Sequence, residues 1–118
     1  MNMNLNDCSV YHEVLLRAKH YYGKDTILLP STRSTKKYMI NNPHTNRFIH
    51  FGAMGYLDYT KYLQLYDKKT ANLHRKRYLN RASNIKGDWK NDDYSANFLS
   101  ILLLWDGLLR LYKIFAVI

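Results

Sequence analysis

The stretch Lys36–Gly52, "KKYMINNPHTNRFIHFG", decides how this chain folds. Two runs rich in aromatic and β-branched residues, 37–40 and 47–51, flank six turn-forming residues, "NNPHTN". Because proline fixes φ and asparagine tolerates the left-handed conformation, the pattern predicts a β-hairpin over residues 36–51. Alternation along the second strand places Ile49 and Phe51 on one face and His50 on the other.

Segments on both sides of the hairpin have helical or strand character. Residues 7–23 predict a first helix, with Asn6 or Asp7 as its cap and Gly23 at its end. The short apolar run 26–30, which ends in proline, predicts a third strand. Further helices are predicted over 56–66, over about 70–83, and from near Asp93 or Ser95 onward. The fold class expected is therefore α+β, a small antiparallel sheet packed by three or four helices.

The two middle helices differ in the side chains that they are predicted to direct toward the core and toward solvent. In 56–66 the helical spacing of Tyr56, Tyr59, Leu63 and Tyr66 predicts a core-facing stripe. In 70–83 the spacing predicts that His74, Arg77 and Arg81 lie on the solvent side, opposite a small apolar stripe. Arg75 falls within the apolar stripe, so its charged end would have to reach past it to water.

Length and charge narrow the function classes. The 118 residues predict a single domain, and an apolar fraction of 47% argues against disorder. The net charge is +9 and the pI about 9.7. Such a field favours polyanions, namely nucleic acid, an acidic protein or an anionic membrane surface.

The positive charge is concentrated in two clusters. Residues 68–90 carry +7 of the net charge, and no acidic residue occurs between 31 and 50. A solvated helix face and a basic loop are the simpler interpretation, but two clusters in so basic a chain favour phosphate contacts. No helix-turn-helix pattern predicts base reading, and tyrosines on core faces are poor evidence for stacking platforms. The nucleic-acid-binding candidates are Lys36, Lys37, Arg47, Arg75, Lys76, Arg77 and Arg81.

The C-terminal segment is the third notable feature. Residues 98–118 are long enough to cross a bilayer, but Asp106, Arg110 and Lys113 interrupt them at high cost. We expect core packing to about Trp105 and an apolar tail over 106–118 that contacts a partner, with membrane contact less favoured. The partner-binding candidates are Leu108, Leu109, Leu111, Tyr112, Ile114 and Phe115.

Signals for catalysis, metals and cofactors are weak. A single cysteine excludes an intrachain disulfide and a cysteine-rich zinc module, and Cys8 and His12 at i, i+4 supply only two of four ligands. Glu13 is the only glutamate, and no nucleophile elbow or P-loop occurs. His50, between apolar neighbours, is better interpreted as a packed residue than as a base. The sequence predicts a protein that is not an enzyme and has no metal or cofactor, and the lack of a secretory signal predicts that it is not secreted.

An ordered series of short motifs suggests a family. "KKY" at 36–38, "IHFG" at 49–52 and "YLDYT" at 56–60 precede "RKRYLNR" at 75–81, "DDYSANF" at 92–98 and "LLW" at 103–105. The series resembles a family of small basic proteins of unknown function from nucleocytoplasmic large DNA viruses, abundant in giant and algal viruses. The insertion "KYLQLYDKKTAN", the first 25 residues and the segment after Trp105 depart from that pattern.

The resemblance implies a viral source and a location in the virion or the host cell interior, and it implies no activity. Together with the charge, it predicts a viral accessory or virion protein that binds nucleic acid non-specifically through phosphates. The alternative is a capsid-associated or scaffold protein, or a self-associating one, that uses its apolar tail. Its basic face would then meet an acidic capsid surface.

Overall fold

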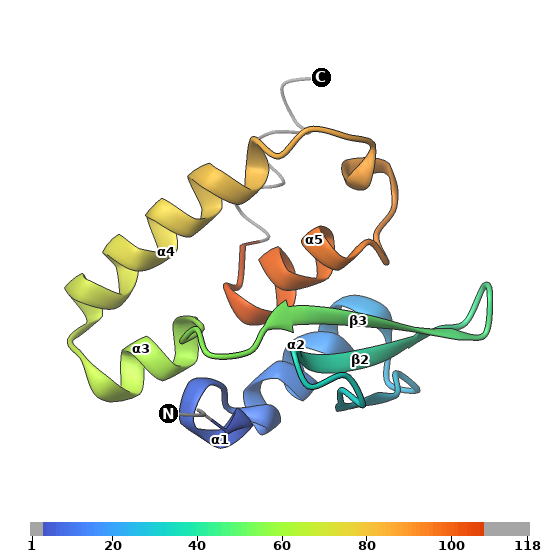
Figure 1. The fold of residues 1–118 in the computed structure, drawn as a ribbon, viewed down its shortest axis with the longest axis horizontal. Coiled ribbons are helices and arrows are strands. Elements are labelled where there is room, and N and C mark those ends of the chain that lie inside the picture. Colours follow the sequence, from blue (N-terminus) through green and yellow to red (C-terminus); the bar gives the residue numbers. More distant parts are fainter. Residues whose placement is uncertain (1–3, 108–118) are drawn as a thin grey trace.

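A computed structural model describes residues 4–107. Within them the fold is α+β, as the sequence predicts. Strands β1 (Leu28–Pro30), β2 (Lys36–Asn42) and β3 (Arg47–Ala53) form an antiparallel sheet in the order β1-β2-β3. Helices surround this sheet, and the hairpin of β2 and β3 projects away from the long helix α4 (Figure 1).

The hairpin has the predicted register and turn chemistry. Ile40 pairs with Ile49 and Tyr38 with Phe51, so their side chains share the buried face. The Asn42 side-chain oxygen accepts a bond from the His44 amide at 3.0 Å, and Asn46 adopts a positive φ of 57°. The asparagines therefore close the turn as predicted.

The predicted first helix is two helices. Asn4 caps α1 (Leu5–Cys8) through a capping box, and α2 (Tyr11–Tyr22) ends at Gly23 as predicted. Ser9, between them, has extended backbone angles, and its hydroxyl is bonded to Tyr38 and Asp58. The helix breaks because these buried bonds hold Ser9 in an extended conformation.

Two helices follow the sheet, and their first residues differ from those predicted. The first helix begins later than predicted, and the second begins earlier. Asp58 caps α3 (Tyr59–Leu65) and Asp67 caps α4 (Lys68–Ser83), each accepting a bond from a backbone amide. The two helices pack against each other, and Figure 1 shows α4 running away from the α3 end of the molecule. Tyr56 thus precedes α3, and its side chain is 72% exposed, so the predicted core-facing position was wrong.

The last helix is short and irregular. After the 3₁₀ turn η1 (Trp89–Asn91), Ser95 caps α5 (Ala96–Leu99), within the predicted start. The chain continues as a π-helical turn, η2 (Ser100–Leu104), and leaves it at Asp106, whose φ is 47°. The predicted helix is therefore interrupted after Leu104, and its part beyond Gly107 lies outside the described residues, whereas core packing to Trp105 is confirmed.

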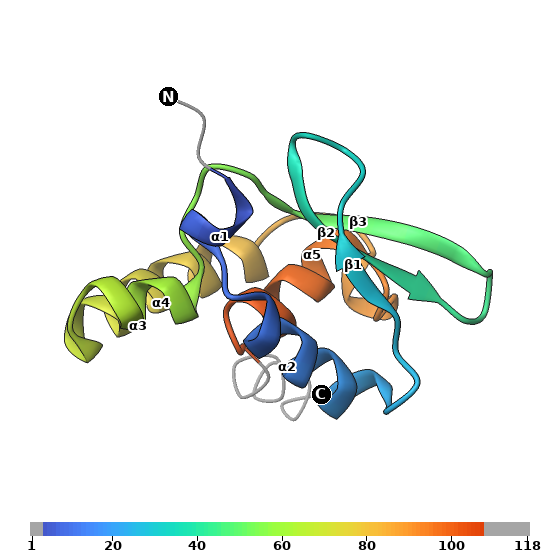
Figure 2. The same cartoon turned by 90° about the horizontal axis from the view of Figure 1, so that it is seen from below.

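The core joins these elements. Val14 and Ala18 of α2 pack with the buried face of the sheet and with the apolar residues of η2. Figure 2 shows α2 and α5 on the same side of the sheet, below the strands, with α5 nearer to them. Trp89, which lies between α4 and α5, is buried in this core and donates to the Ile85 carbonyl at 2.7 Å.

Candidate functional site: a cationic aromatic cavity

A cavity of about 390 Å³ opens between the base of the hairpin, the loop before α3, α4 and η2. Its volume lies in the range typical of small-molecule sites. The strand β3 contributes Gly52 and Ala53, and η2 contributes Ser100 and Leu104. The remaining lining residues come from β2, from the loop, from the two helices and from the end of η2: Lys37, Tyr56, Leu57, Tyr62, His74, Arg77, Tyr78, Arg81 and Trp105.

Basic side chains line the α4 wall of this cavity. His74, Arg77 and Arg81 lie on one flank of the helix because they are three and four residues apart. Both arginines are exposed, and within residues 4–107 neither forms an ion pair with a carboxylate. None of the lining residues in the described chain is acidic. The wall is therefore a concentrated positive surface, in line with the charge pattern of the sequence.

Aromatic rings form the floor and the side walls. Tyr78 stacks on Trp105 with ring centroids 4.6 Å apart and planes 13° apart. His74 stacks on Tyr62 at 4.2 Å and 11°, and the Arg81 guanidinium lies 5.6 Å from the Tyr78 ring. These pairs hold the cationic side chains against flat apolar surfaces, which limits the conformations they adopt.

Tyr78 also contributes a hydroxyl. Burial raises the pKa of Tyr78 to about 12, against the opposing effects of a hydrogen bond with Ser100 and of the Arg81 charge. The phenol thus stays protonated near neutral pH and remains a hydrogen-bond donor.

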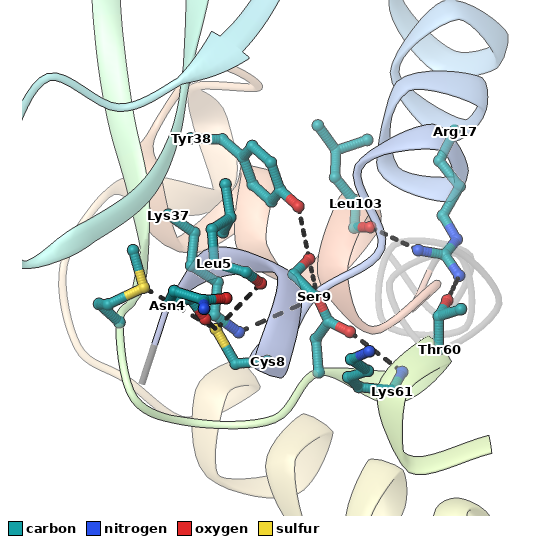
Figure 3. A network of polar contacts seen from close by, with 12 residues as sticks. Asn4, Leu5, Cys8, Ser9, Arg17, Lys37, Tyr38, Thr60, Lys61 and Leu103 are labelled. Atoms are coloured by element: carbon teal, nitrogen blue, oxygen red, sulfur yellow. Dashed lines mark hydrogen bonds and ion pairs between the residues drawn. The ribbon is translucent and has the colours of Figure 1, made fainter. Parts of the chain in front are cut away.

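Lys37 does not belong to an exposed cationic surface. Its side chain is 3% exposed, and its Nζ lies 3.9 Å from Asp58 Oδ2. A polar network surrounds this pair: the Tyr38 hydroxyl donates to Ser9 Oγ at 2.6 Å, and the Ser9 hydroxyl donates to Asp58. Figure 3 shows Tyr38 pointing toward Ser9. The prediction that Lys37 contacts phosphate was wrong, because its ammonium is enclosed and already paired.

Burial dominates the titration of that pair. It lowers the pKa of Lys37, while the Asp58 charge opposes this effect. It raises the pKa of Asp58, against the Lys37 charge and the bonds from Ser9 and the Lys61 amide. The two groups join β2 to the start of α3 at the edge of the cavity, where the Lys37 side chain forms part of the lining.

Arg75 is also directed inward. Its Nε donates to the Trp105 carbonyl at 2.8 Å, and its Nη2 donates to the Asp106 carbonyl. The guanidinium lies 5.2 Å from the Tyr59 ring. The structure argues against a phosphate contact of Arg75, because two of its donors satisfy backbone carbonyls just after η2.

The other predicted cations fall in three places. Lys36 is the cross-strand partner of Ala53, so it lies beside the cavity. Arg47 is exposed at the opposite end of β3, six residues or about 20 Å along the strand. Lys76 is exposed on the other flank of α4. Arg77 and Arg81 therefore line one cavity and Lys36 lies on the strand next to it, whereas Arg47 and Lys76 do not line it.

Several cavity residues were not among the sequence candidates: Tyr56, Tyr62, His74, Ser100 and Trp105. The signal that pointed to one of them, Tyr56, is the aromatic step 56–60, whose helical spacing predicted a core-facing stripe. Helical spacing alone does not reveal that Tyr56 precedes the helix. It also does not reveal that η2 brings Trp105 against Tyr78.

The remaining sequence candidates, for metal binding, catalysis and partner contact, have less support in the structure. Cys8 is buried on α1 and His12 is exposed on α2, and residues 4–107 hold no cluster of three metal-ligating side chains. His50 Nδ1 lies 2.7 Å from Ser31 Oγ, and burial, with Arg33, lowers the pKa of His50. The tail candidates Leu108, Leu109, Leu111, Tyr112, Ile114 and Phe115 lie outside the described residues.

Comparisons with known proteins give one match. A model described as "Family of unknown function (DUF5754)" matches residues 27–62, which contain β1, β2, β3 and the start of α3. The chain is similar to that family over this segment. No curated protein and no solved structure matches. Among the described helices, none combines the length and the apolar character that crossing a bilayer requires.

Proposed function

We propose that this protein is a non-enzymatic accessory or virion protein of a large DNA virus that binds nucleic acid non-specifically through phosphates. The observation that carries the binding is the position of Arg77 and Arg81 on successive turns of α4. Both are exposed, both line the same cavity, and neither has a carboxylate partner within residues 4–107.

This arrangement suits phosphate chemistry. Guanidinium groups bind phosphate oxygens through two parallel N–H bonds, and four residues of helix separate the two arginines by about 6 Å along the axis. Lys36, the cross-strand partner of the lining residue Ala53, adds a further cation on the hairpin. Because α4 has no acidic residue between 68 and 83, no fixed negative charge on the helix repels a phosphate backbone.

The lack of sequence preference follows from the same geometry. The exposed cations lie on a helix flank beside a cavity, and phosphate contacts carry no base information. The viral assignment is supported by the ordered motifs from "KKY" to "LLW".

A salt titration tests the binding. Affinity for random duplex DNA should fall linearly on a logarithmic salt scale. Replacing both arginines (Arg77→Ala with Arg81→Ala) should flatten the slope by up to about two units. The matched control is Lys19→Ala with Lys24→Ala, which removes two exposed charges outside the cavity and should leave the slope nearly unchanged.

Two results would overturn the proposal. One is the absence of detectable binding to duplex or single-stranded DNA at low salt. The other is an equal loss of slope in the control variant, which would show that net charge alone, and not the α4 flank, governs the binding.

A further inference from the structure

The cavity has features that a phosphate-binding surface alone does not need. A backbone of phosphates requires exposed cations on a convex or grooved face. Here the exposed cations form one wall of a hollow of about 390 Å³, whose lining also includes the rings of Tyr56, Tyr62, His74, Tyr78 and Trp105. The shape and the walls point to a ligand that is partly flat and partly anionic.

Basic side chains indicate where the anionic part of such a ligand would bind. Arg77 and Arg81 stand on the α4 wall, with His74 one turn before them. No carboxylate from the described residues lines the cavity to compensate these charges. The hydroxyls of Ser100 and Tyr78 add hydrogen-bonding groups to the same space. A phosphate monoester or diester satisfies such a set of donors.

Tyr56 indicates where the flat part of the ligand would bind. This tyrosine lines the cavity with 72% of its surface exposed, and within residues 4–107 its ring contacts no other aromatic ring. Large aromatic side chains are usually buried, and an exposed one beside a pocket offers a free face for stacking. The stacked pair of Tyr62 and His74 adds a second flat surface in the same cavity.

The backbone beside the cavity is irregular as well. Ser100 and Leu104 lie at the two ends of the π-helical turn η2, and both line the cavity. Such turns occur often at functional sites. Gly52 has a φ of 81°, and an added Cβ would lie 2.8 Å from Leu104 Cδ1, so the glycine allows β3 to approach η2 closely.

We infer that this cavity binds a nucleotide, with its base stacked on Tyr56 and its phosphate held by Arg77 and Arg81. The ligand is a nucleotide, either free or as one unit of a single strand. The inference rests on the proposed function for its phosphate-binding flank and adds to it a preference for unpaired bases. Stacking of this kind tolerates any base, because every base has a flat face.

Calorimetric titration tests the inference with four probes: a nucleoside monophosphate, the matching nucleoside, inorganic phosphate, and a short single-stranded oligonucleotide. The monophosphate should bind more tightly than either the nucleoside or phosphate alone. Tyr56→Ala should weaken binding of the monophosphate and of the single strand about 5- to 150-fold, the range for loss of one base stack. Phe48→Ala removes an exposed aromatic residue outside the cavity and should change neither.

The outcomes separate the two proposals. Salt-dependent binding of nucleic acid that Tyr56→Ala leaves unchanged, with no binding of the monophosphate, would overturn the nucleotide site and leave the phosphate interface intact. Binding of the monophosphate without binding of any polymer would support the site with a free nucleotide as its ligand, and would overturn the proposed nucleic-acid function. Binding of inorganic phosphate as tightly as the monophosphate would overturn the role of the base.

Discussion

Lys37 Nζ lies 3.9 Å from Asp58 Oδ2 in the interior of the protein, where the two side chains are 3% and 0% exposed. Lys37 belongs to β2 and Asp58 caps α3, so the pair joins the sheet to the helical hairpin. Neighbouring groups complete the pair, since Ser9 and the Lys61 amide both donate to the Asp58 carboxylate. A buried charge with this many partners is stable only as long as the set stays whole.

The first prediction concerns that pair. Asp58→Asn keeps the shape of the side chain and a capping oxygen but leaves the Lys37 ammonium unpaired, and it should lower the free energy of unfolding by about 3–5 kcal/mol. The double variant Lys37→Met with Asp58→Asn should recover part of this loss, because no buried charge remains. Denaturant unfolding of the wild type, both single variants and the double variant measures the coupling. Strictly additive losses would contradict the interpretation.

Gly52 gives a second prediction. Its φ is 81°, and an added Cβ would lie 2.8 Å from Leu104 Cδ1 and 3.2 Å from Lys37 Cβ. Gly52→Ala should therefore cost backbone strain of about 1–2 kcal/mol and a further 1–3 kcal/mol of overpacking.

Gly55 provides the matched control for that substitution. Its φ is 94°, but an added Cβ would meet no atom within 4 Å. Gly55→Ala should thus lower the stability by the backbone strain alone, without the overpacking. Thermal unfolding of the two variants compares them, and equal losses of stability would show that β3 and η2 pack too loosely for an added Cβ to clash.

The hairpin shows what the sequence could predict about the fold. Its strands, its turn and its buried face follow from local rules, because alternation and turn residues act over a few positions. The break between α1 and α2 does not follow from such rules. It depends on the bonds that Ser9 makes to Tyr38 and Asp58, 29 and 49 residues away in the chain.

The candidate site also contains residues that the sequence could identify and residues that it could not. Charge counting identified Arg77 and Arg81, which are exposed as expected. It also selected Lys37 and Arg75, because counting cannot distinguish a cation on the surface from one bonded inside. The role of Tyr56 depends on where α3 begins, and element boundaries are the least certain part of any pattern-based prediction.

The third prediction separates neighbouring arginines on α4. Arg75 donates to the carbonyls of Trp105 and Asp106, so Arg75→Ala should lower the free energy of unfolding by about 1.5–3 kcal/mol. Arg77→Ala removes an exposed charge and should change stability by less than about 0.5 kcal/mol while weakening binding of DNA. Parallel unfolding and DNA-binding measurements on the two variants check this, and a stability loss in Arg77→Ala as large as that in Arg75→Ala would contradict it.

The fourth prediction concerns alkaline pH. Burial raises the pKa of Tyr78 to about 12, and it also raises the pKa values of Tyr22 and Tyr38 above the ordinary value of 10.0. Between pH 10.0 and about 12 the unfolded chain loses these protons while the folded protein keeps them. The stability that the protonated phenols contribute is thus complete below pH 10.0 and is lost as pH rises toward the folded-state pKa values.

The free energy of unfolding should accordingly fall with increasing pH in that range, by up to about 1.4 kcal/mol per pH unit for each such tyrosine. Denaturant unfolding at a series of pH values, with tyrosinate absorbance followed in parallel, measures the slope. Tyr78→Phe keeps the ring that stacks on Trp105 and removes the titrating hydroxyl, so its slope should be shallower than that of the wild type. An unchanged slope in that variant would show that Tyr78 ionises equally readily in the folded and unfolded states, and that the wall of the cavity it forms is open to water.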